Sequence, residues 1–222
     1  MKKFLTIMSL LMFILPGCVE PSPEPDISFD YESSTVELRI FHGETIDNAT
    51  AFFNITIELN HELAPVHARN FHSHVEQGNY NVTTFHRIID NFMIQGGDFQ
   101  SHDGRGGYAA NWEGYCGGIE ASYGDCEQTD WTIPDEADNG LVHTACTISM
   151  AKTSQPNTGG SQFFLMPDDI DQHTWLDGVH TVFGDITDGC EHVTSISEVT
   201  TGSGDRPVMP VIIYEAEIIS VN

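Results

Sequence analysis

Apolar and polar residues alternate along two segments near the start of the folded chain. The apolar positions of these segments are Val36, Leu38 and Ile40, and then Phe53, Ile55, Ile57 and Leu59. Successive side chains of a strand point to opposite faces, so an alternation with a period of two indicates a strand with one buried face. Both segments are therefore predicted to be half-buried strands.

The spacing of apolar residues changes from strand-like to helical in the next segment. Val66, Phe71 and Val75 recur at roughly the spacing of helical turns. Pro65 suits the first turn of a helix, and Gly78 suits the position just beyond the last turn. The pattern predicts one helix between these two residues.

Further short apolar segments predict a sheet with many strands. They lie at 84–89, 92–95, 144–150, 162–166 and 180–186, followed by a short helix near Glu191 and a long strand at 211–221. Many short strands with few helices favour a sheet closed on itself, because a closed barrel leaves no unpaired edges. Between 104 and 141 the pattern gives way to glycines, aromatic residues and acids, which predicts a long insertion. We expect one mainly β domain over residues 33–222.

The residues before this domain have the composition of an export signal. Two lysines precede an apolar run over residues 4–15, which is too short to span a bilayer comfortably. Residues 1–17 are therefore predicted to be a signal peptide. Cys18 follows the small residue Gly17, an order that resembles the lipobox of prokaryotic lipoproteins and predicts lipid attachment at Cys18. Residues 18–32 are acidic and proline-rich, which favours an extended tether. The alternative is plain secretion, with Cys18 left as a spare thiol.

The chain is strongly acidic. It has 8 lysines and arginines against 33 aspartates and glutamates, a net charge of −25. Removal of residues 1–17 takes away two lysines and no acids, which leaves 6 − 33 = −27. Such a surface repels nucleic acid and anionic lipid, so we predict no nucleic-acid partner and a membrane link only through an N-terminal acyl chain. We expect an exported monomer, anchored to the outer face of the cell membrane or otherwise secreted.

The cysteines beyond Cys18 predict disulfide bonds. An even set of four, at Cys116, Cys126, Cys146 and Cys190, allows three connectivities in an exported chain. Cys116 and Cys126 share one loop-like stretch and are predicted to pair, which leaves Cys146 with Cys190. A zinc site is the alternative, but the chain has no CxxC pair to support it. The predicted helix carries histidines without the spacing of ligands, and we expect them to be exposed: His67, His72 and His74.

Three stretches carry the candidate chemistry. They read FHRIIDNFMIQGGDF (85–99), SMAKTSQPNTGGSQFFLM (149–166) and WLDGVHTVFG (175–184). In this order and spacing they resemble the cyclophilin family of peptidyl-prolyl cis/trans isomerases, and the resemblance covers the chain from about Thr35 onward. It implies a closed eight-stranded antiparallel barrel capped by two helices, with a substrate groove on its outer face. It also implies a protein that acts on proline-containing segments without a cofactor or a metal.

The resemblance further implies roles for individual residues. Those taking part in catalysis would be Arg87, Phe92, Gln95 and His180. Those binding substrate would be Met93, Ala151, Lys152, Thr153, Gln162, Phe164, Trp175 and Leu176. In this assignment Phe92, Met93, Phe164 and Leu176 form a socket for the proline ring, with His180 on its rim. Lys152 contributes its main chain, and Trp175 stands at the edge of the groove.

The chemistry explains why an arginine is needed among apolar residues. Rotation about an X–Pro bond is slow because amide resonance raises a barrier of roughly 18–20 kcal/mol. In the twisted state the proline nitrogen gains a lone pair, and a guanidinium can donate a hydrogen bond that exists mainly in that state. Arginine suits this role because it stays protonated and its planar fork can be aligned. The rival hypothesis is a noncatalytic module that holds proline-containing segments in the same groove.

This sequence departs from the family at a few positions. Asp90-Asn91 replaces the usual Pro-Gly turn, and because both pairs form turns we expect only a local change. Lys152 stands where many eukaryotic members have asparagine, and its main-chain contact should survive. The insertion at 104–141 is the largest departure.

Overall fold

The computed structural model describes residues 32–222. The predicted signal peptide, the lipid-attachment residue Cys18 and the tether lie outside the described residues. Between Glu32 and Asn222 no helix is both long and apolar enough to cross a bilayer.

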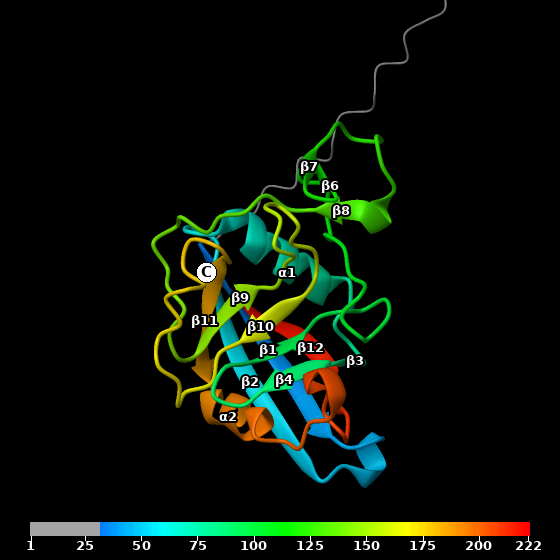
Figure 1. The fold of residues 1–222 in the computed structure, drawn as a ribbon, viewed down its shortest axis with the longest axis vertical. Helices are drawn as coiled ribbons and strands as arrows, with labels where there is room; N and C mark the ends of the chain where they lie inside the picture. The colour runs from blue at the N-terminus through cyan, green and yellow to red at the C-terminus, as the bar shows by residue number, and fades with distance from the viewer. Residues whose placement is uncertain (1–31) are drawn as a thin grey trace, which may run out of the picture.

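One curled antiparallel sheet forms the body of the molecule (Figure 1). Its nine strands are hydrogen-bonded in the order β3-β12-β1-β2-β11-β9-β10-β5-β4. Their bounds are Ser33–His42 (β1), Ala51–Asn60 (β2), Thr83–Thr84 (β3), Arg87–Ile89 (β4), Met93–Gly96 (β5), Thr147–Met150 (β9), Phe163–Leu165 (β10), Val182–Asp188 (β11) and Val211–Val221 (β12). The alternation read from the sequence is confirmed in β1, where Val36, Leu38 and Ile40 are fully buried.

The sheet is not the closed eight-stranded barrel that the sequence led us to expect. Its edge strands are β3 and β4, which are separated in the chain only by Phe85 and His86. The N–H of Phe85 donates to the carbonyl of Val211 and that of His86 to the carbonyl of Gln95, each at 3.0 Å. The two residues thus carry the chain from one edge of the sheet to the other. Because β3 and β4 are consecutive parts of one extended segment, they cannot pair with each other, and the ladder stays open.

Two helices lie at opposite ends of the curled sheet, as predicted (Figure 1). Helix α1 (Pro65–Glu76) begins at the predicted proline and is followed by Gly78, whose φ of +69° suits glycine. Its apolar side chains pack into the core, with Ala68 and Phe71 fully buried. Helix α2 (Cys190–Ser197) buries Val193 and Ile196 in the same way. Within residues 32–222 there are also three 3₁₀ turns: η1 (Ile46–Asn48), η2 (Gln128–Asp130) and η3 (Ser203–Asp205).

The expectation that the histidines of α1 are exposed was wrong. His67, His72 and His74 are all buried. Nδ1 of His67 lies 2.7 Å from the carboxylate of Glu136, and Nδ1 of His72 lies 3.1 Å from the hydroxyl of Ser34. The ring of His74 packs between aromatic rings, and burial lowers its pKa to about 3. These partners come from distant segments, so the helix pattern alone did not indicate them.

The insertion has a small sheet of its own. Strands β6 (Tyr115–Cys116), β7 (Ile119–Glu120) and β8 (Trp131–Thr132) pair in the order β7-β6-β8 and stand apart from the main sheet in Figure 1. Cys116 and Cys126 form a disulfide within it, as predicted.

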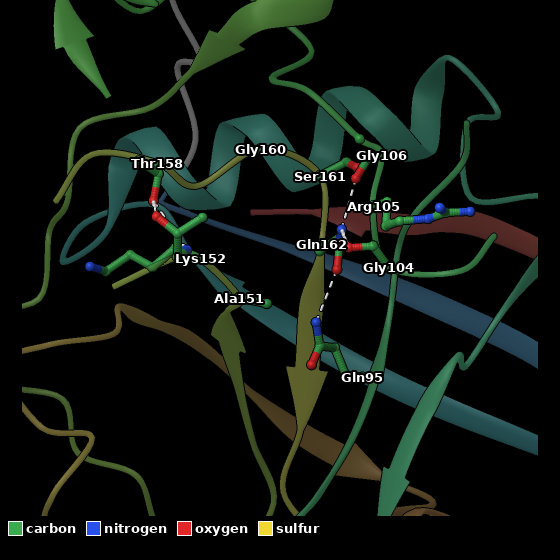
Figure 2. A pocket seen from close by; sticks show the side chains of 12 residues that line it. Gln95, Gly104, Arg105, Gly106, Ala151, Lys152, Thr158, Gly160, Ser161 and Gln162 are labelled. Atoms are coloured by element: carbon green, nitrogen blue, oxygen red, sulfur yellow. Dashed lines mark hydrogen bonds between the residues drawn. The ribbon is translucent and has the colours of Figure 1, made fainter. Parts of the chain in front are cut away.

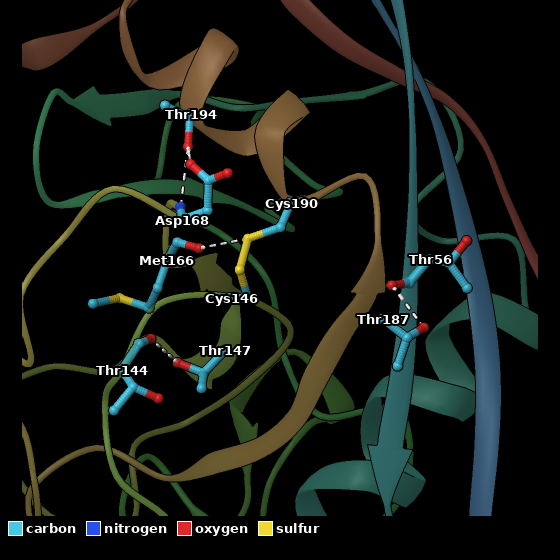
Figure 3. The surroundings of a disulfide bond; sticks show 9 residues. All are labelled: Thr56, Thr144, Cys146, Thr147, Met166, Asp168, Thr187, Cys190 and Thr194. Atoms are coloured by element: carbon cyan, nitrogen blue, oxygen red, sulfur yellow. Dashed lines mark hydrogen bonds between the residues drawn. A yellow bond between two sulfur atoms is a disulfide. The ribbon is translucent and has the colours of Figure 1, made fainter.

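The second predicted disulfide, Cys146–Cys190, is also confirmed. It joins the residue before β9 to the first residue of α2 (Figure 3). The N–H of Cys146 donates to the carbonyl of Met166, at 3.2 Å. Since all four sulfur atoms are joined in pairs, they do not supply thiolate ligands for zinc.

Candidate active site

The alternation of side chains along β4, β5 and β10 produces two different faces. Arg87 pairs with Gln95, and Gln95 pairs with Phe164, so these three side chains share one face of the sheet. Residues one position away point into the main core: Ile88, Ile94, Phe163 and Leu165. The outer face of these strands therefore carries one cation and one amide beside apolar side chains.

A small apolar cluster on this outer face is separate from the main core. It consists of the buried side chains of Met93, Phe164, Met166 and Leu176. Above it is a cavity of about 260 Å³ that opens to solvent. The cavity is lined by Arg87, Phe92, Met93, Gln95, Ala151, Lys152, Phe164, Trp175, Leu176 and His180. All ten are residues that the sequence singled out, brought together from three separate stretches.

Asp90 and Asn91 form the turn that precedes Phe92. Asn91 has a φ of +56°, a left-handed conformation that asparagine tolerates better than most residues. The N–H of Phe92 donates to the carbonyl of Ile89, at 3.2 Å. The ring of Phe92 lies 5.4 Å from that of Trp175, between ring centroids. Trp175 is 63% exposed, so it stands at the edge of the cavity.

His180 is held in a fixed orientation on the rim of the cavity. Its Nδ1 lies 2.9 Å from the carbonyl oxygen of Met150. Because a carbonyl only accepts hydrogen bonds, Nδ1 carries the proton. Burial lowers the pKa of His180 below its usual value, although the Met150 contact opposes the shift. The ring is therefore neutral at pH 7, and Nε2 is its acceptor nitrogen.

A second cavity of about 280 Å³ adjoins the first. Thr153 and Gln162, also predicted, line this second cavity and not the first, while Gln95, Ala151 and Lys152 line both. Nε2 of Gln95 donates to Oε1 of Gln162, at 2.9 Å. Nε2 of Gln162 in turn donates to the carbonyls of Gly104 and Gly106, at 3.0 and 2.7 Å (Figure 2). This chain of amides fixes both glutamines between the two cavities.

Several residues of the site were missed by the sequence reasoning. The second cavity is also lined by Gly104, Arg105, Gly106, Gly107, Thr158, Gly160 and Ser161. The GRGG run at 104–107 was a visible signal for a close backbone approach. At Gly107, φ is +94° and a Cβ would collide with Oγ of Ser161, so glycine is required there.

The side chain of Lys152 points away from Gln162 (Figure 2). It is only 5% exposed, and its Nζ lies 3.3 Å from the carboxylate of Asp135 and 3.2 Å from the carbonyl of Gln155. The ammonium group is thus occupied away from the cavities. This arrangement is compatible with the expectation that Lys152 serves a substrate through its main chain.

Arg87 has a carboxylate partner. Its Nε lies 3.4 Å from Oδ2 of Asp205, and the two side chains are 41% and 48% exposed. Among residues 32–222, no group of three or more histidine, cysteine or acidic side chains could hold a metal ion. The site therefore combines an apolar socket, a paired arginine and amide donors.

Comparisons with known proteins support the resemblance seen in the sequence. The family model for cyclophilin type peptidyl-prolyl cis-trans isomerase/CLD matches residues 45–218. Peptidyl-prolyl cis-trans isomerase-like 1 of Aspergillus fumigatus is 38% identical over 170 residues, which cover 77% of this chain and 92% of the relative. The peptidyl-prolyl cis-trans isomerase of Acinetobacter baylyi is 35% identical over 183 residues, which cover 80% of this chain and 86% of the relative.

The fold is also similar to that of a known cyclophilin. A crystal structure of a cyclophilin type peptidyl-prolyl cis-trans isomerase from Cryptosporidium parvum matches with a TM-score of 0.66 and 25% identity. The match covers 85% of this chain and 98% of that one. Family model, relatives and fold agree, and the chain belongs to the cyclophilin family of peptidyl-prolyl cis-trans isomerases.

Proposed function

We propose that X–Pro bonds are isomerised at the cavity between Arg87 and the apolar cluster, and that the substrates are proteins outside the cytoplasm. The observation that carries this proposal is the position of one guanidinium at the mouth of an apolar socket that is open to solvent. A proline ring in contact with Phe92, Met93 and Phe164 would leave the amide bond beside Arg87. No covalent bond is broken, so the reaction needs neither a nucleophile nor a metal.

In this mechanism the socket holds the ring while the other half of the amide turns. Gln95 and the main chain of Lys152 bind the backbone on either side of the turning bond. As the bond twists, the proline nitrogen becomes pyramidal, and a terminal N–H of Arg87 donates a hydrogen bond to it. This bond is stronger in the twisted state than in either planar state, so it lowers the barrier without tightening substrate binding.

The test is prolyl isomerisation of a short X–Pro peptide, measured by exchange NMR. We expect Arg87→Ala to lower kcat by about 10²–10³-fold, the usual cost of removing one donor that acts in the transition state. Arg87→Lys keeps the charge but loses the planar fork and should recover little of the activity. If Arg87→Ala isomerises the peptide as fast as the wild type, the arginine is not the catalytic group. If the variant also fails to bind peptide, the socket and not the chemistry has been damaged.

The proposed location outside the cytoplasm is supported by the signal-like N-terminus and by two disulfides, which persist in oxidising compartments. We propose that Cys18 carries a lipid that holds the isomerase at the outer face of the membrane, where it assists the folding of exported proteins. The mass of the first peptide of the mature protein tests the anchor. An unmodified Cys18, or cleavage elsewhere, would contradict it.

A further inference from the structure

The carboxylate beside Arg87 belongs to Asp205, a residue that the sequence analysis did not predict to take part in the site. We propose that Asp205 is a positioning residue, which orients the guanidinium of Arg87 toward the X–Pro bond. The inference rests on the proposed catalytic role of Arg87. Asp205 itself does not line the cavity that holds the proposed substrate, so it acts through the arginine.

The atoms that form the pair explain how it would act. Oδ2 of Asp205 lies nearest to Nε of Arg87, on the stem side of the guanidinium. A carboxylate held at Nε leaves the two terminal nitrogen atoms for another acceptor. Since the guanidinium is planar, attraction of Nε to Asp205 narrows the range of directions in which the terminal N–H groups point. An unpaired arginine side chain would sample many rotamers, of which only some aim at the proline nitrogen.

The backbone holds Asp205 in a conformation that most residues avoid. Its φ is +59°, and the preceding Gly204 has a φ of +73°. The surrounding loop fixes this conformation, because the N–H of Gly202 donates to the carbonyl of Arg206 at 2.7 Å and that of Val208 to Thr200 at 2.9 Å. Aspartate adopts the left-handed region more readily than most residues, so this tight loop can hold the carboxylate beside Arg87.

The loop is also anchored to the other wall of the site. Nη2 of Arg206 donates to the carbonyl of Asp103, at 3.2 Å. Asp103 belongs to the segment that leads into the GRGG run of the second cavity, and the carboxylate of Asp98 accepts main-chain N–H groups from that segment. Burial alone would raise the pKa of Asp98, but hydrogen bonds from the hydroxyl and N–H of Ser101 and from the N–H groups of Gly106 and Gly104 hold it well below its usual value. Asp205 is thus positioned from a loop that is attached to the groove and not from a free surface segment.

The effect of this pair should be modest, because both partners are partly exposed and salt screens them. Asp205→Asn is the variant that tests the charge of Asp205 most directly. Asparagine keeps the size of the side chain and tolerates the left-handed backbone, so the change removes mainly the charge. We expect kcat to fall about two- to fivefold, the range measured for exposed ion pairs, with KM unchanged. Asp205→Glu restores the charge and should recover part of kcat.

Glu62→Gln is the matched control, since it removes one exposed negative charge beside the start of α1 and should leave kcat unchanged. Asp205→Asn is also measured in an Arg87→Ala background, where a residue that acts only through Arg87 has no further effect. Raising the salt concentration should reduce the difference in kcat between the wild type and Asp205→Asn, because salt screens the ion pair.

The outcomes separate this inference from the function on which it rests. Full kcat in Asp205→Asn, with Arg87→Ala inactive, overturns the positioning role and leaves the catalytic role of Arg87 intact. The positioning role is also overturned if Asp205→Asn lowers kcat equally in the wild-type and Arg87→Ala backgrounds, or if it changes KM alone. Full activity in Arg87→Ala removes the proposed function and the inference together.

Discussion

At the scale of single residues, Phe92 is the clearest test of the socket. Its half-buried ring closes one side of the cavity, and replacing it with alanine removes apolar contact area without cutting into the main core. We expect Phe92→Ala to weaken binding of an X–Pro peptide about 5–30-fold, equivalent to about 1–2 kcal/mol of lost apolar contact. An NMR titration measures the affinity directly.

Phe52 offers a matched control for this change, because it is a phenylalanine on β2 that is 58% exposed and does not line the cavity. Phe52→Ala should bind peptide as the wild type does. Unchanged affinity in Phe92→Ala would show that the proline ring is held elsewhere.

The residues of the site could be predicted to the extent that they lie in continuous motifs. The stretches around Arg87, Gln162 and His180 supplied the whole lining of the first cavity. Residues outside such stretches were missed. Asp205 reaches Arg87, and Asp135 reaches Lys152, only because the sheet curls and brings loops together. A contact of this kind leaves no periodic trace in the sequence.

At the scale of elements, the local pattern predicted the strands and helices well, but it wrongly predicted that the sheet closes into a barrel. β1, β2 and α1 follow the expected periodicities because burial of one face determines which side chains suit them. Whether the two edges of the sheet join depends on hydrogen bonds from Phe85 and His86 to separate strands. Those bonds are backbone contacts between distant segments, which side-chain periodicity does not encode.

The disulfide between β9 and α2 should contribute strongly to stability. It joins residues 44 positions apart, and cross-linking a loop of that length reduces the entropy of the unfolded chain. The chain-entropy model gives about 4 kcal/mol for such a loop. We expect the double variant Cys146→Ser/Cys190→Ser to lose about 3–4 kcal/mol in urea unfolding.

The other disulfide provides the comparison. Cys116 and Cys126 are 10 positions apart, and the bond joins strand β6 to the loop between β7 and β8 of the insertion. Cys116→Ser/Cys126→Ser should therefore loosen that sheet with a smaller effect on global unfolding. A larger loss from this pair than from Cys146–Cys190 would mean that the insertion, and not the α2 junction, limits stability.

At the scale of the whole molecule, two groups of charges oppose each other when the pH falls. Protonation of carboxylates relieves the repulsion that a net charge of −25 creates. Buried histidines have the opposite effect, because burial is the main cause that lowers the pKa of His61, His72, His74, His86, His143 and His180. Between pH 6.5 and 5 most carboxylates are still ionised, with ordinary pKa values of about 4. The histidines should therefore determine how the stability of the fold changes in this pH range.

The sign follows from proton binding. An unfolded histidine takes up a proton near pH 6.5, whereas the folded one resists until its lowered pKa, about 4 for His61 and about 3 for His74. The unfolded state therefore binds more protons, and stability is complete above pH 6.5 and is lost as the pH falls toward those values. For fully buried His74 the loss between pH 6.5 and 5 is about 2 kcal/mol, at 1.36 kcal/mol per pH unit.

Thermal unfolding measured from pH 7 to 5 tests this balance, and we expect Tm to fall across the range. His74→Phe places a group that does not titrate in the same aromatic surroundings, so Tm should depend less on pH in this variant. His102→Asn is the control, because His102 is exposed and asparagine tolerates its φ of +56°, so the slope should not change. A Tm that rises on acidification would mean that relief of carboxylate repulsion outweighs the buried histidines even where the carboxylates remain charged.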